Sequence, residues 1–253
     1  MKSASASLAA ALALLAAAPA FAQAPESQTV PAACPVSADH VTANMGLERS
    51  RAAVADGKLT ILAMGSSSIE GVGASRRELS FVPLLEAGLE SRLAGVEVTV
   101  VNKGIGGETA KETADRLERE IAASRPDLVI WQLGTNDVLR DRPMADVFAD
   151  FRRGQDVLDA AGVDVLLIDP QRLPEATTNA NFRGRNPALG EVARLIGLEG
   201  GRKHYAVLTR FAAMHDWDGL DRGGVGPDDL HLNDQGYACW AAVTAEGLAA
   251  ALR

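Results

Sequence analysis

The segment LTILAMGSSSIEG occupies residues 59–71. Its first part, Leu59–Met64, is a short apolar run that ends at Gly65, which is typical of a strand buried on both faces of a parallel sheet. Small and hydroxyl-bearing residues follow directly. Ligands of open α/β sheets bind outside the carboxyl ends of the strands. The segment therefore predicts a parallel sheet with a functional edge that starts at residue 65.

Comparable apolar runs predict further strands at 96–101, 128–133, 163–168 and 205–208. Helices are expected at 78–94, 109–124, 143–161, 187–200 and 233–252. Thr109 followed by Glu112 is a capping box, which marks the start of the second of these helices. The alternation of strands and helices predicts an α/β fold, a single three-layer domain with a central parallel sheet and helices on both faces.

The composition excludes several protein classes. The chain has 253 residues, of which 47% are apolar and 23% charged, as in an ordinary globular protein rather than a disordered or collagen-like one. Its net charge of −8 repels phosphate backbones and anionic membrane surfaces. Aromatic residues make up only 4%, too few to favour a stacking platform for single strands. We therefore expect no nucleic-acid partner.

The first 22 residues have the pattern of a secretory signal peptide. Lys2 supplies the positive charge, Leu8–Ala18 the apolar stretch, and Ala20–Ala22 a small-x-small cleavage pattern after Pro19. The apolar stretch is too short to span a bilayer, so we expect cleavage after Ala22 and no stable membrane anchor. The expected location is the periplasm or the extracellular space.

Two cysteines remain after this cleavage, Cys34 and Cys239. A lipoprotein anchor at Cys34 is set aside, because Pro31 stands where a lipobox has Leu or Val. An oxidising compartment favours a disulfide between the two cysteines, and two buried free thiols are the alternative. We divide the chain into a signal peptide (1–22), an N-terminal extension (23–56) with a short helix at Ala38–Ala55, and one domain (57–253).

Four polar segments fall where a parallel sheet places function. They are GSSSIEG (65–71), NKGIGGET (102–109) and GTND (134–137), each after an expected strand, and DDLH (228–231) near the C-terminus. Together they supply a nucleophile, a base with an orienting carboxylate, and donors for an oxyanion. Each segment alone also fits an ordinary turn or helix cap, so the indication comes from their combination.

These segments resemble the four sequence blocks of the SGNH (GDSL-type) serine esterases and lipases, in the same order and over about residues 58–250. The resemblance implies a flavodoxin-like α/β fold and hydrolysis of carboxylic esters. It implies that Ser67 is the nucleophile, His231 the base and Asp228 the acid that orients it. It also implies that the oxyanion is bound by the N–H groups of Ser67 and Gly107 and by the side chain of Asn136.

The sequence departs from the family pattern at two positions. Ser66 replaces the aspartate of GDS, and Ile69 replaces the usual threonine two residues after the nucleophile. The serines on either side of Ser67 leave a shift of the nucleophile by one position open. Asp229 likewise remains an alternative for the acid.

Other chemistries lack their patterns. The α/β-hydrolase motif GxSxG requires glycine at position 69, and no GxGxxG or GxxxxGK[ST] motif is present. The four histidines have no spacing typical of a metal site. We therefore expect no cofactor and no metal.

The resulting hypothesis is an exported serine esterase that forms an acyl-enzyme on a small-molecule or polysaccharide ester, with acetyl groups on carbohydrate as the first choice. A lysophospholipase or thioesterase of longer acyl chains and a non-catalytic carbohydrate-binding module are the alternatives. Gln171 and Arg172, in the segment between Pro170 and Pro187, are candidates for contacts with polar substrate, and an ordinary surface loop is the competing interpretation. The sequence does not indicate an oligomeric state.

Overall fold

The computed structural model describes residues 1, 34, 36–43, 46–215 and 224–253. The expected signal peptide and its cleavage site lie outside the described residues. Within the described part, no helix has the length and apolar content needed to cross a membrane.

The described residues form a six-stranded sheet with the strand order β1-β6-β5-β4-β2-β3. The strands are β1 (Val41–Thr42), β2 (Lys58–Gly65), β3 (Glu97–Gly104), β4 (Leu128–Gln132), β5 (Asp164–Ile168) and β6 (Ala206–Leu208). Strands β2 to β6 are parallel and correspond to the five expected strands, while β1 adds an antiparallel edge next to β6. The sequence pattern does not indicate β1, because two residues are too few to show a period.

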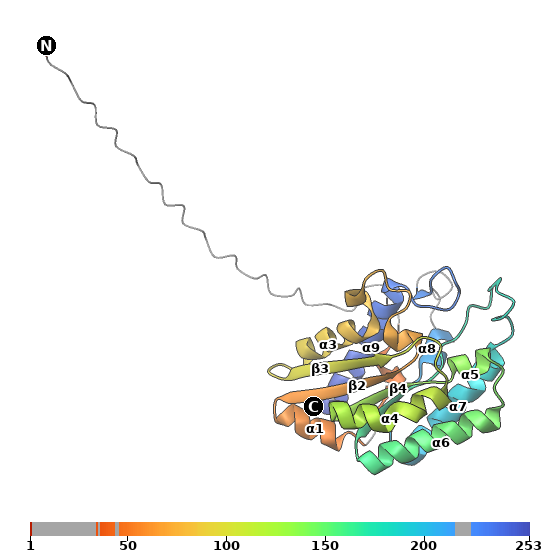
Figure 1. Ribbon diagram of the computed structural model, residues 1–253, viewed down its shortest axis with the longest axis horizontal. Helices are drawn as coiled ribbons and strands as arrows, with labels where there is room; N and C mark the ends of the chain where they lie inside the picture. The colour runs from red at the N-terminus through yellow and green to blue at the C-terminus, as the bar shows by residue number, and fades with distance from the viewer. Residues whose placement is uncertain (2–33, 35, 44–45, 216–223) are drawn as a thin grey trace.

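Helices cover both faces of this sheet (Figure 1). They are α1 (Glu48–Ala55), α2 (Ser67–Glu70), α3 (Phe81–Arg92), α4 (Ala110–Ser124), α5 (Thr135–Leu139), α6 (Met144–Ala161), α7 (Asn186–Lys203), α8 (Arg210–His215) and α9 (Asp234–Leu252), with short 3-10 turns at Ala38–His40 and Arg77–Leu79. Apolar side chains of α3, α8 and α9 pack on one face, and those of α4, α6 and α7 on the other. The predicted three-layer α/β fold is confirmed.

Strand β2 shows why the chain adopts this arrangement. Leu59, Ile61 and Ala63 point into the core beneath α3 and α9, whereas Leu62 and Met64 point into the core beneath α4 and α6. All five are fully buried. Burial of both faces removes the need for polar residues in the run, which is why the segment is apolar without alternation.

Part of the expected N-terminal extension belongs to the folded body. Strand β1 pairs with β6, and the backbone N–H of Ser50 in α1 donates to the buried carboxylate of Asp164 at 2.6 Å. The helix expected at Ala38–Ala55 is limited to its second half. Gly46 interrupts it with a φ of +87°, and a Cβ there would lie 2.0 Å from the backbone oxygen of His204.

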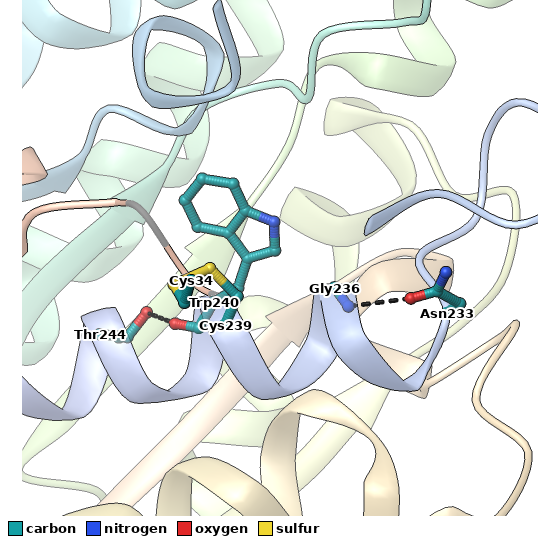
Figure 2. Close-up of a disulfide and its surroundings, with 6 residues drawn as sticks. All are labelled: Cys34, Asn233, Gly236, Cys239, Trp240 and Thr244. Carbon is teal, nitrogen blue, oxygen red and sulfur yellow. Dashed lines mark hydrogen bonds between the residues drawn. A yellow bond between two sulfur atoms is a disulfide. The ribbon is translucent and has the colours of Figure 1, made fainter. Parts of the chain in front are cut away.

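The predicted disulfide is confirmed. Cys34 and Cys239 are bonded, with their Cα atoms 5.1 Å apart, and the bond attaches residue 34 to the buried side of α9 (Figure 2). Figure 2 also shows the start of α9, where the Asn233 side chain caps the helix by accepting from Gly236 N at 2.9 Å. The disulfide and the cap thus fix the helix that follows His231.

Candidate active site

Register in the sheet brings three of the expected loops to one edge. β2 pairs with β3 along its whole length to Gly65, and with β4 as far as Met64. The loops that follow these strands carry Ser67, Gly107 and Asn136. Because neighbouring parallel strands end together, the three residues start from adjacent backbone positions.

The turn after β2 places Ser67 at the first position of α2. Gly65 has a φ of +157°, and a Cβ at this position would lie 2.7 Å from Ile69 Cγ1 and 2.8 Å from Gln132 Oε1. Only glycine fits so close an approach. Ile69 is buried in the core, which explains an apolar residue where the family has threonine.

The three adjacent serines have different surroundings. Ser66 is buried, and both its N–H and its hydroxyl donate to Gln132 Oε1, at 2.9 and 3.0 Å. The Ser68 hydroxyl lies 3.5 Å from Gln171 Oε1. The Ser67 side chain is half-buried, and its hydroxyl makes no hydrogen bond with the described residues. Among the described residues, the Ser67 hydroxyl is therefore the one of the three that has no hydrogen-bond partner.

We call Asp228–His231 the histidine turn. The Asp228 Oδ2 atom lies 2.5 Å from His231 Nδ1. The other carboxylate oxygen accepts from the backbone N–H groups of Leu230 and His231, at 3.1 and 2.9 Å. A carboxylate on Nδ1 leaves Nε2 as the basic nitrogen of the ring, which is the arrangement that serine catalysis requires.

Burial opposes ionisation of Asp228, but the hydrogen bonds from the His231 side chain and from the backbone of the turn outweigh it and hold the pKa of Asp228 below its usual range. Asp229 has a different partner, because its carboxylate accepts from Thr177 Oγ1 at 2.8 Å. Its φ of +59° turns the backbone between the two acids. The structure thus places Asp228, and not Asp229, against the His231 ring.

A hydrogen bond joins the loops that carry two of the expected oxyanion donors, Asn136 and Gly107. Asn136 Nδ2 donates to the backbone oxygen of Glu108 at 2.9 Å, which attaches the start of α5 to the loop after β3. Gly107 precedes that residue with a φ of +82°. Neither the Ser67 N–H nor the Gly107 N–H has a hydrogen-bond partner among the described residues. Among the described residues, two backbone N–H groups and the second hydrogen of the Asn136 amide are therefore available to bind a negative charge.

The histidine turn packs against the segment that follows Ser67. A Cβ at Gly73 would lie 3.0 Å from His231 Cβ, and the Tyr237 hydroxyl donates to Val72 O at 2.7 Å. No hydrogen bond joins Ser67 to His231 in the described structure.

A family model for the non-GDSL lipase-like family matches residues 33–245. The chain belongs to this family. Its GSS at residues 65–67, in place of GDS, agrees with that description. The matches to this family and to solved lipolytic hydrolases confirm the resemblance to SGNH (GDSL-type) enzymes that the four blocks indicate.

Individual relatives extend this comparison. Esterase TesA of Pseudomonas aeruginosa is 31% identical over 115 residues, which are 46% of this chain and 56% of TesA. The structure of a lipase/acylhydrolase from Enterococcus faecalis aligns with a TM-score of 0.63 and 24% identity, over 76% of this chain and 96% of that one. A two-domain esterase active on acetylated mannans aligns with a TM-score of 0.62 and 22% identity, over 85% of this chain and 56% of that one. The two structures share the fold of this family member.

The two residues expected to contact substrate have protein partners. Gln171 is 3% exposed, and its Nε2 donates to the backbone oxygen of Leu230. The Arg172 guanidinium stacks over the Phe211 ring at 5.4 Å and pairs with Glu175. Arg172 keeps a partly exposed side chain, whereas the Gln171 amide faces the protein interior.

Sequence reasoning missed a buried polar pair behind Ser68. Arg210 is 3% exposed, and its Nη1 donates to Ser68 Oγ at 3.3 Å. Burial lowers the pKa of Arg210 to about 10 and raises the pKa of Asp169 to about 7, and Asp169 accepts from Phe211 N at 2.9 Å. The only available signal was that Asp169 directly follows an expected strand.

Elsewhere the described residues hold no group of three or more His, Cys, Asp or Glu side chains that could hold a metal ion. A cavity of about 690 Å³ lies between α4 and α6, near the residues that precede β4 and β5. None of the expected site residues lines it. It lies near the amino ends of β4 and β5, whereas Ser67 follows the carboxyl end of β2.

Proposed function

We propose that the protein is an exported serine esterase that hydrolyses carboxylic esters through an acyl-enzyme intermediate. The observation that carries this proposal is the 2.5 Å contact between Asp228 Oδ2 and His231 Nδ1, in a turn that packs against the segment following Ser67. A serine hydroxyl is a weak nucleophile until a positioned imidazole accepts its proton. The Ser67 hydroxyl has no hydrogen-bond partner among the described residues, unlike those of Ser66 and Ser68, so it is the group to be activated.

In the proposed reaction, Ser67 Oγ attacks the ester carbonyl and His231 Nε2 takes the hydroxyl proton. The carbonyl oxygen becomes an oxyanion, which the Ser67 N–H, the Gly107 N–H and Asn136 Nδ2 stabilise. His231 then donates the proton to the departing alcohol, leaving an ester bond between the acyl group and Ser67. Water, deprotonated by the same His231, hydrolyses this ester and restores the enzyme.

Export is supported by the signal-peptide pattern at residues 1–22 and by the bond between Cys34 and Cys239. Disulfides persist mainly in oxidising compartments. We therefore place the protein in the periplasm or outside the cell.

We propose short acyl groups, acetyl above all, on a carbohydrate as the substrate. An esterase that shares the fold, at 22% sequence identity, is active on acetylated mannans. Arg172 remains the candidate for a contact with polar substrate, because part of its side chain is exposed.

One observation favours a different ester. Val72 and Ile105 are exposed apolar residues at 37% and 49%, and they lie in the loops that carry Ser67 and Gly107. Apolar side chains beside the reacting groups suit a longer acyl chain or an aromatic alcohol. The second candidate is therefore hydrolysis of longer acyl esters, as in a lysophospholipase or thioesterase.

The test is hydrolysis of p-nitrophenyl acetate, butyrate and octanoate by the protein beginning at Gln23, beside Ser67→Ala and the matched control Ser66→Ala. We expect Ser67→Ala to lose at least about 10³-fold in kcat, with acetate the best of the three substrates. A best rate with octanoate supports the second candidate. Equal rates for the wild type and Ser67→Ala contradict the serine mechanism, and failure of a fluorophosphonate to label Ser67 favours a carbohydrate-binding module.

A further inference from the structure

The loop between β5 and α7, residues 169–185, contacts the histidine turn at two points. Gln171 Nε2 donates to Leu230 O, and Thr177 Oγ1 donates to Asp229 Oδ2 at 2.8 Å. Gln171 and Thr177 are both buried. We call this segment the β5–α7 loop.

The Gln171 contact acts on the peptide group that carries His231. The oxygen of Leu230 and the nitrogen of His231 belong to one planar peptide unit. Gln171 binds its oxygen, and Asp228 Oδ1 binds its N–H at 2.9 Å. Two hydrogen bonds on opposite edges fix the orientation of this plane, and with it the direction in which the His231 side chain leaves the backbone.

The same amide also reaches the nucleophile segment. Gln171 Oε1 lies 3.5 Å from the Ser68 hydroxyl, which in turn accepts from the buried Arg210 guanidinium at 3.3 Å. Ser68 follows Ser67 in α2. The buried Gln171 side chain thus contacts both the peptide group that precedes His231 and the Ser68 hydroxyl next to Ser67.

We propose that Gln171 is a positioning residue of this active site, whose amide holds the Leu230–His231 peptide and the Ser68 hydroxyl and so sets the His231 ring relative to Ser67. This inference rests on the proposed function. It gives Gln171 a role different from the substrate contact that its place in the sequence suggests, because the amide is bonded to the protein on both its nitrogen and its oxygen.

The test replaces Gln171 by Met, which is similar in length and volume but has no amide. Activity is measured per active site, after titration with a fluorophosphonate, on p-nitrophenyl acetate and butyrate. We expect kcat to fall about 10- to 100-fold for both esters with KM within about twofold, because a small displacement of a catalytic group costs this much. Gln171→Glu keeps the acceptor for Ser68 but loses the donor to Leu230 O, and we expect a similar loss of kcat.

The matched control is Asn186→Leu. The Asn186 side chain bonds the backbone N–H and oxygen of Leu173, both at 2.9 Å, and so supports the same loop without contacting the histidine turn or α2. We expect this variant to lower the melting temperature while keeping the kcat of the titrated sites. This separates loss of loop stability from loss of catalytic geometry.

Three outcomes overturn the inference. A raised KM with unchanged kcat in Gln171→Met identifies a substrate contact, and an equal loss of kcat in Asn186→Leu identifies general loop support. Full kcat in both Gln171 variants, while Ser67→Ala is inactive, overturns the positioning role and leaves the proposed function intact. Failure of the proposed function has a different signature, which is retained activity in Ser67→Ala.

Discussion

The two halves of the candidate site are built in different ways. Ser67, Gly107 and Asn136 each lie within a few residues of the end of a parallel strand, so the register of β2, β3 and β4 determines where their backbones start. The histidine turn lies in an irregular segment before α9, and hydrogen bonds from side chains shape it. Backbone ladders position the first half, and individual side chains position the second. The two halves should therefore respond differently to substitution.

The largest effect is expected in the histidine turn, from Asp228→Asn. The amide cannot hold the Nδ1–H tautomer of His231 as a carboxylate does, and we expect kcat to fall by about 10⁴-fold, the loss typical of such a change in serine proteases. The measurement is kcat per titrated site on p-nitrophenyl acetate. Asp229→Asn is the matched control, and it should lose far less because Asp229 bonds Thr177 and not the ring. A larger loss in Asp229→Asn would assign the acid to Asp229.

The contact between Asp228 and His231 should also make the free energy of unfolding depend on pH. Because the pKa of Asp228 is lowered by folding, its ionised form stabilises the native state above the ordinary carboxyl pKa of about 4. That contribution is lost as the pH falls through the lowered value. Urea unfolding at several pH values between 2 and 6 should show that the free energy of unfolding decreases less on acidification in Asp228→Asn than in the wild type.

A smaller effect is expected on the strand-end side, from Asn136→Ala. The substitution removes one of the three proposed oxyanion donors, and such donors are worth about 10²- to 10³-fold in kcat. The hydrogen bond to Glu108 O is lost as well, so the melting temperature should fall slightly. KM should change little, since the donor acts mainly in the transition state. A KM-dominated loss would show that Asn136 contacts the substrate in the ground state.

The comparison also explains what could be predicted from the sequence. The buried strands appear as apolar runs, and a residue next to a strand end in the sequence is next to it in space. Position alone therefore placed the loops of Ser67, Gly107 and Asn136 at the carboxyl ends of the strands, whereas the roles of these residues came from the resemblance to SGNH enzymes and stay predictions. The short elements β1, α2, α5 and α8 escaped because they are too short for a periodic pattern.

The sequence predicts where the histidine turn lies but not which of its two aspartates contacts the His231 ring. Asp228 and Asp229 lie three and two residues before His231, and this spacing does not decide between them. The contacts decide, because Asp228 lies against the His231 ring and Asp229 accepts from Thr177. Gln171 lies far from the turn in sequence, and no local pattern shows that its amide meets Leu230 O. Contacts between distant irregular segments depend on the assembled fold, so they are absent from any window of sequence.

The smallest effect is expected at the far end of the β5–α7 loop, from Thr177→Val. Valine keeps the shape of threonine but removes the hydroxyl that donates to Asp229 and accepts from Asn179 N at 3.1 Å. Because these bonds involve a buried side chain, we expect a loss of about 1–2 kcal/mol in unfolding free energy. The contact between Asp228 and His231 is kept, so kcat should fall by less than about tenfold, which corresponds to 1.4 kcal/mol. Thr178→Val, on an exposed neighbour, is the matched control and should resemble the wild type in both measurements. A loss as large as that of Asp228→Asn would mean that Asp229 and its threonine, rather than the Asp228 carboxylate, set the orientation of His231.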